Sequence, residues 1–112
     1  MSVDEQIQRV TASLSHLDGF RIKKMFGGAS VYSEEVVFCM ITRDGIPHFR
    51  IGEENIEEYK VAGMKPFAPK GRQSKMIMPY YTVPEGLWED QEKLEQWVEK
   101  ALVEAKSAKK KK

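Results

Sequence analysis

The amino-acid sequence predicts an α+β domain: an antiparallel sheet of about five strands, packed by an N-terminal, a middle and a C-terminal helix into a two-layer sandwich. Apolar residues recur at helical spacing near both ends of the chain. Residues 20–51 instead alternate short apolar runs with turn residues, as strands and hairpins do. The length of 112 residues suits a single domain, which we place at residues 1–105.

The first predicted helix covers residues 3–18. Its apolar residues recur three or four positions apart, so they line one side of a helix: Ile7, Val10, Leu14 and Leu17. Ser2 and Glu5 have the spacing of a capping box, in which both side chains accept hydrogen bonds from free N–H groups of the first turn. Gly19 is a natural residue to close the helix, because glycine adopts the left-handed conformation at little cost.

Four strands are predicted after this helix, at residues 20–26, 29–32, 36–41 and 46–51. Gly27 and Gly28 allow a bend between the first two. The third run is apolar at every position, so we expect both of its faces to be covered. Asp44-Gly45 is a strong hairpin signal. Pro47 has no N–H to donate, which suggests that the fourth strand lies at an edge of the sheet.

The remaining elements are a short helix at about residues 55–62, a last strand at residues 76–81 and a long final helix. Asn55 and Glu58 again match a capping box, and Gly63 would close the short helix. Asp90 is the expected cap of the final helix. That helix carries a continuous apolar stripe with Glu and Lys residues opposite: Leu94, Trp97, Val98, Ala101, Leu102 and Ala105.

The charge of the chain is unevenly distributed. Eighteen basic and 17 acidic residues give a net charge of +1, which excludes a uniformly basic nucleic-acid binder and a uniformly acidic mimic of nucleic acid. Five of the lysines lie in residues 106–112, so the rest of the chain has a net charge of −4. We predict that residues 106–112 form a disordered lysine-rich tail, which is either a solvated end or an arm that attracts polyanions.

Residues with the chemistry for catalysis or metal binding are scattered, and we predict no catalytic, cofactor-binding or metal-binding residues. Neither His16 nor His48 has a second ligand at metal-binding spacing. Cys39 lies within an apolar run, where a thiol is a small core residue. Adjacent carboxylates fall in turns or on helix surfaces. The single cysteine, the polar N-terminus and the lack of a long apolar run predict a cytoplasmic protein without membrane association.

A basic stretch is the strongest candidate for a binding site, because residues 59–84 contain no acidic residue. Basic residues interleaved with aromatic ones can bind nucleic acid or an acidic protein. Alternatively, the aromatic residues belong to the core and the basic residues merely flank a loop. The candidate partner-binding residues are Lys60, Lys65, Phe67, Lys70, Arg72 and Lys75.

Four segments resemble those of the TfoX (Sxy) N-terminal domain family and occur in the same order. They read Met25-Phe26-Gly27-Gly28, Gly63-Met64-Lys65-Pro66-Phe67, Met78-Pro79-Tyr80-Tyr81-Thr82-Val83-Pro84, and Leu94 to Leu102 around Trp97 and Ala101. The resemblance covers residues 14–105. It implies an antiparallel α+β fold similar to that of secretion-chaperone-like domains, without established catalytic residues. The best-known members regulate natural competence in bacteria as transcription co-activators.

Three hypotheses about function follow. The first is a non-enzymatic regulatory module that binds a protein partner, such as the transcription machinery, or forms a homodimer, with a strand edge near Pro47 or Pro79 recruiting the partner. The second is weak, direct binding of nucleic acid through residues 60–75 and the lysine tail. The third is an enzyme with a small pocket under the sheet edge.

Overall fold

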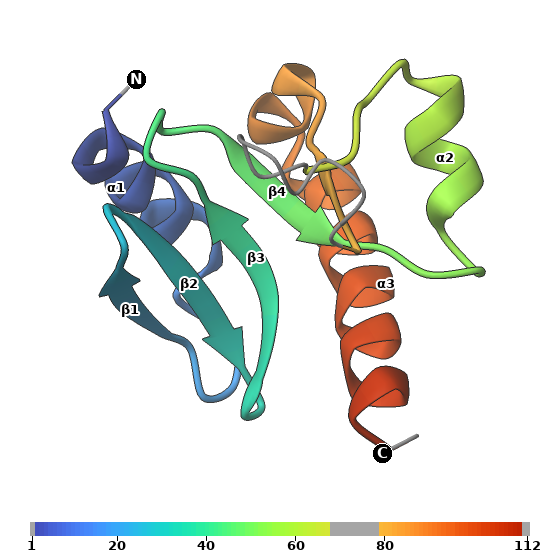
Figure 1. Ribbon diagram of the computed structural model, residues 1–112, viewed down its shortest axis with the longest axis horizontal. Coiled ribbons are helices and arrows are strands. Elements are labelled where there is room, and N and C mark those ends of the chain that lie inside the picture. The colour runs from blue at the N-terminus through green and yellow to red at the C-terminus, as the bar shows by residue number, and fades with distance from the viewer. Residues whose placement is uncertain (1, 68–78, 111–112) are drawn as a thin grey trace.

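Five antiparallel strands lie in the order β1-β2-β3-β4-β5 in the computed structural model, which describes residues 2–67 and 79–110 (Figure 1). The strands are β1 (Arg21–Met25), β2 (Gly28–Ser33), β3 (Val36–Ile41), β4 (Pro47–Arg50) and β5 (Tyr80–Thr82). The helices are α1 (Val3–Leu14), α2 (Ile56–Val61) and α3 (Gln91–Lys110), with a short 3-10 helix at Glu85–Glu89. The predicted α+β fold is confirmed.

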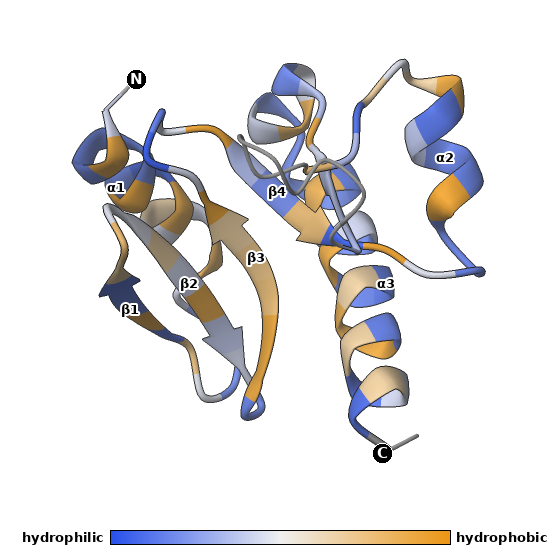
Figure 2. Ribbon diagram, in the orientation of Figure 1, coloured by the Kyte–Doolittle hydropathy of each residue, from blue (hydrophilic) through white to orange (hydrophobic). Residues whose placement is uncertain are grey.

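The helices α1 and α3 form a layer against one face of the sheet. Helix α3 packs on β3 and β4, and α1 packs on β2 and β3. In Figure 1 α1 lies behind β1 and β2, and α2 stands beside α3 at the other end of the sheet. Figure 2 shows that β3 is hydrophobic along its length, as expected for the central strand. We call the face away from α1 and α3 the open face.

Helix α1 begins as predicted. The Ser2 hydroxyl accepts a hydrogen bond from the Glu5 amide at 3.1 Å, and the Glu5 carboxylate accepts one from the Ser2 amide at 2.8 Å. Val10 and Leu14 are fully buried, while the helix ends at Leu14, before the predicted limit. These two residues therefore anchor the helix in the core.

A β-bulge in β3 explains why this strand is apolar throughout. Val31 pairs with Cys39 and Tyr32 pairs with Val37, so Phe38 is an extra residue on β3. A bulge changes the phase of the alternation, and both Phe38 and Cys39 are fully buried. Val37 and Met40 are only half-buried. No residue of β3 is exposed, so both faces of this strand are covered, the face toward the helices more completely than the other.

Strand β4 is an interior strand, which corrects the prediction from Pro47. Its neighbours are β3 and β5, with Ile41 opposite Pro47 and Thr82 opposite His48. The pairing with β5 ends at His48. The nitrogen of Pro47, which has no hydrogen to donate, therefore faces no partner strand on that side. Pro47 is thus tolerated as the first residue of an interior strand.

The outer side of β5 is partly covered by the segment at residues 65–67. The Phe67 amide donates to the carbonyl of Tyr80 at 2.7 Å, and the Thr82 amide donates to the carbonyl of Lys65 at 2.9 Å. Pro66 forms an isolated bridge with Tyr81. The edge near Pro79 is therefore occupied over these residues. Residues 76–78 of the predicted last strand lie outside the described residues.

Asn55 does not cap α2 with its side chain, contrary to the predicted capping box. Its side chain is buried and closes the preceding loop instead. The Gly52 amide donates to Asn55 Oδ1 at 2.7 Å, and Asn55 Nδ2 donates to the Arg50 carbonyl at 3.1 Å. A buried amide satisfies its hydrogen bonds where partners are nearest, which here is the backbone after β4.

Helix α3 continues to Lys110, which differs from the predicted disordered tail from residue 106. Ala105 is still buried against the core, and Lys106 Nζ lies 2.7 Å from a carboxylate oxygen of Glu34. These contacts extend the helix by more than a turn past Ala105. Residues 111 and 112 lie outside the described part. None of the helices described is apolar over a length that could cross a bilayer.

Candidate functional site

A hollow of about 870 Å³ lies on the open face of the sheet. Its floor follows from the strand register, because Ser30 lies opposite Met40 and Met40 lies opposite His48. Residues directly opposite one another in antiparallel strands share a face. Most of the remaining lining is apolar: Met25, Phe26, Ala29, Ile41, Ile46, Pro66 and Phe67, with Thr42, Arg43 and Asp44 at one side. The hollow can therefore accept an apolar group.

His48 is the titratable residue of this floor. Its side chain is only 5% exposed, and its Nδ1 lies 3.0 Å from the carbonyl of Ile46. The ring of Phe67 packs edge-on against it, with centroids 5.4 Å apart. Burial lowers the pKa of His48, although hydrogen bonds to backbone groups oppose the shift. A neutral imidazole is thus part of the hollow at neutral pH.

The stability of the protein is expected to fall as the pH is lowered below about 6.5, where an unfolded histidine gains a proton. Because the pKa of His48 is lower in the folded state, the unfolded state binds the proton first and is favoured by acid. Thermal melts between about pH 8 and about pH 5 should show this fall in the wild type and a weaker fall in His48→Gln. An identical pH profile of wild type and His48→Gln would contradict the prediction.

Two hairpin turns meet beside the hollow. Phe26 and Gly27 connect β1 to β2 with φ angles of +51° and +81°, and the Phe26 side chain is 92% exposed. The turn between β3 and β4 contains the exposed residues Arg43 and Asp44. A side chain at position 27 would lie 3.3 Å from Cγ and Nε of Arg43, so the arginine runs alongside the first turn. An exposed aromatic ring and two opposite charges thus border the apolar hollow.

Among the described residues, the hollow is lined by one imidazole, that of His48, and by no thiol. The Cys39 thiol is fully buried among core residues, and burial raises its pKa, so it stays protonated. No cluster of three or more His, Cys, Asp or Glu residues suited to a metal ion occurs within residues 2–67 and 79–110.

The predicted partner-binding residues are only partly gathered here. Phe67 lines the hollow, and Lys65 lies two residues before it on the segment that covers β5. Lys60 is exposed on α2. Lys70, Arg72 and Lys75 lie outside the described residues, so the basic site stays a prediction.

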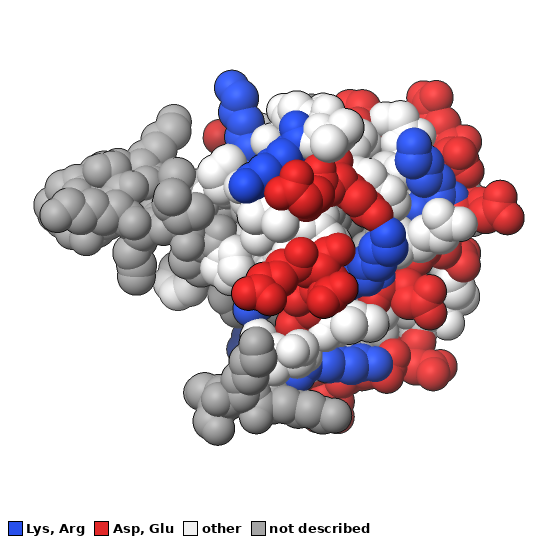
Figure 3. All heavy atoms as spheres, turned by 90° about the vertical axis from the view of Figure 1, so that its right-hand side faces the viewer, with Lys and Arg blue, Asp and Glu red and all other residues white. Residues whose placement is uncertain are grey.

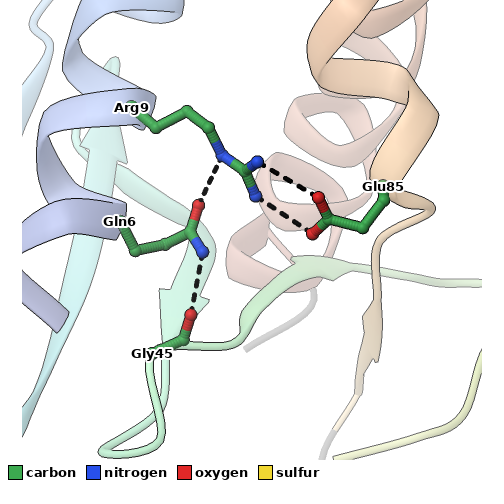
Figure 4. Close-up of polar contacts among 4 residues, drawn as sticks. All are labelled: Gln6, Arg9, Gly45 and Glu85. Carbon is green, nitrogen blue, oxygen red and sulfur yellow. Dashed lines mark hydrogen bonds and ion pairs between the residues drawn. The ribbon is translucent and has the colours of Figure 1, made fainter. Parts of the chain in front are cut away.

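A polar network joins α1 to the β3–β4 turn and to the 3-10 helix, and sequence reasoning missed it (Figure 4). Both terminal nitrogens of Arg9 donate to the Glu85 carboxylate at 3.1 Å, and Arg9 Nε donates to Gln6 Oε1 at 2.9 Å. The buried Gln6 donates to the Gly45 carbonyl at 2.8 Å. The hydrogen bonds from Arg9 lower the pKa of Glu85. This network holds the turn that borders the hollow, and its members are too far apart in sequence to give a local signal.

These features define a small α+β domain with a mainly apolar hollow on one face of its sheet. A family model described as TfoX N-terminal domain matches residues 12–105, most of the chain, so the chain belongs to this family. The resemblance seen in the sequence is thereby confirmed. The family is a regulatory one related to competence. No curated protein matches the chain in sequence.

Proposed function

We propose that the protein is a non-enzymatic regulatory module of the transcription co-activator type, which acts by binding another protein through the open face of its sheet. Membership of a regulatory family supports this function. The observation that carries the proposal is the apolar hollow of about 870 Å³ beside the exposed Phe26. Exposed apolar surface of this kind typically marks an interaction site.

The proposal favours protein over nucleic acid as the partner, because the hollow is mainly apolar and its adjacent charges cancel. Within the part of the chain that the structure describes, Arg43 and Asp44 give this border no net charge. Nucleic-acid binding depends instead on concentrated positive charge. On the face formed by α2 and α3, acidic and basic side chains are interspersed, so positive charge is not concentrated there (Figure 3).

The test is affinity capture from a native extract of the source organism, followed by calorimetry with the purified partner. Wild type and a chain ended at Ala105 should recover the same stoichiometric protein. Phe67→Ala should weaken its binding by about tenfold or more, because it removes an aromatic wall of the hollow. Melting curves must show that both variants fold.

Two results would contradict the proposal. One is equal affinity of wild type and Phe67→Ala for every captured protein. The other is capture of nucleic acid alone, with binding that is lost at higher salt and in the chain ended at Ala105.

A further inference from the structure

We propose that the partner of the open face is a second copy of this chain, with Phe26 of each copy entering the hollow of the other around a two-fold axis. This inference rests on the proposed function, since it names the occupant of the same face. It follows from the conformation of Phe26, from the shape of the hollow and from the charges beside it.

Phe26 is poorly suited to its turn. Two-residue turns in which both residues have positive φ favour Asn-Gly, and a bulky side chain in this conformation is strained. Within one chain the ring gains almost no burial in return, because it is 92% exposed. A contact outside the chain would bury it.

The hollow beside Phe26 can receive such a ring. Met25, Met40 and Phe67 line it with apolar surface, and methionine side chains adapt their shape to an inserted group. Phe26 itself lies at the border of the hollow. A two-fold axis close to Phe26 therefore places each ring over the hollow of the other copy, which makes the contact self-complementary.

The charges beside the hollow also fit a second copy. Arg43 and Asp44 are adjacent and exposed, and neither forms an ion pair with another described residue. In a two-fold contact, Arg43 of one copy meets Asp44 of the other, and the reverse pair forms at the same time. Such complementarity selects a partner and fixes its register.

Two other described surfaces are less suited to pairing with themselves. The edge strand β1 carries Arg21, Lys23 and Lys24, so two copies would bring like charges together. The stretch leading into α2 carries Glu53, Glu54, Glu57 and Glu58, which would repel in the same way. Like charges placed opposite one another oppose association.

The first experiment measures the mass of the purified full-length chain over a range of concentrations by sedimentation equilibrium. We expect a dimer for wild type and a dissociation constant at least about tenfold higher for Phe26→Asn. Asparagine tolerates positive φ, so this variant should melt at the same temperature or higher. Val61→Asn on α2 is the control, because Val61 is also 85% exposed but lies away from the hollow, and it should dimerise like wild type.

The second experiment reverses charges. Arg43→Asp and Asp44→Arg should each weaken the homodimer, because each leaves two like charges beside the hollow. An equimolar mixture of the two variants should form a heterodimer, detected by native mass spectrometry, since every charge again meets its opposite.

The inference is overturned if wild type stays monomeric up to about 1 mM, the range of weak association. It is also overturned if Phe26→Asn dimerises as tightly as wild type, or if the charge-reversed variants fail to associate when mixed. A monomeric chain that still captures a different protein through the hollow refutes this inference and leaves the proposed function standing. Equal capture of every protein by wild type and Phe67→Ala refutes the proposed function, and the mass measurement then tests the dimer separately.

Discussion

Replacing Gly28 with alanine is expected to lower the free energy of unfolding by about 3 kcal/mol or more, because the new methyl group would meet backbone atoms. A Cβ at position 28 would lie closer than 3.0 Å to the carbonyl oxygen of Ile41. That oxygen belongs to the central strand β3, whose position is set by pairing with both β2 and β4. The clash can be relieved only by separating β2 from β3. Thermal melts should show a fall in Tm of more than about 10 °C.

Gly86→Ala provides the matched control for this prediction. A Cβ at position 86 has no neighbouring heavy atom within 4 Å, and the glycine does not have a positive φ. Alanine there should be neutral, or stabilising by up to about 1 kcal/mol through its smaller unfolded-state entropy. If Gly28→Ala melts within about 2 °C of Gly86→Ala, the close approach of β2 and β3 is incorrect.

Much of the fold could be predicted because its elements carry local signals. The capping box of Ser2 and Glu5 was recognised from spacing alone and is present in the structure. The apolar stripe of α3 was also confirmed, from Leu94 to Ala105. Both patterns repeat within a few residues, so they are legible without knowledge of the tertiary structure.

The predictions of local structure failed where contacts with distant parts of the chain determine the conformation. The apolar run of β3 was interpreted as a regular strand, whereas a bulge at Phe38 directs an extra residue into the core. Asn55 had the spacing of a cap but is buried, and its side chain forms hydrogen bonds with the backbone of Arg50 and Gly52 instead. Neither the bulge nor the burial leaves a mark in the sequence of the segment itself.

The candidate site was less predictable than the fold. Phe26 was placed at the end of the first strand, whereas the hairpin register places it in the turn, where it is exposed. His48 was seen only as an isolated histidine, and its place on the floor of the hollow depends on its neighbours across the sheet. Sites built from several strands depend on which residues lie opposite one another, and these residues are far apart in the sequence.

Replacing Tyr59 with alanine is expected to cost about 3–5 kcal/mol, whereas phenylalanine should be neutral or stabilising. The Tyr59 side chain is fully buried and joins α2 to the core, with its ring 4.5 Å from that of Trp97 and 6.1 Å from that of Tyr81. Alanine removes these contacts and leaves a cavity. The hydroxyl, however, has no hydrogen-bond partner among the described residues, so removing it alone relieves a buried polar group. Urea unfolding of both variants measures the two effects.

The ionisation of Tyr59 gives an independent measurement on the same pair of variants. Burial raises the pKa of Tyr59, so the folded state holds the phenol proton more tightly than the unfolded chain. The stability that comes from this tighter proton binding is therefore complete below about pH 10 and is lost as the pH rises above that value. Between neutral pH and about pH 11, Tyr59→Phe should lose less stability than wild type. The pKa of the buried Tyr80 is also raised, and its effect on stability is the same in both proteins. If Tyr59→Phe is destabilised by more than about 1 kcal/mol at pH 7, the hydroxyl makes a hydrogen bond and its interpretation as unpartnered is wrong.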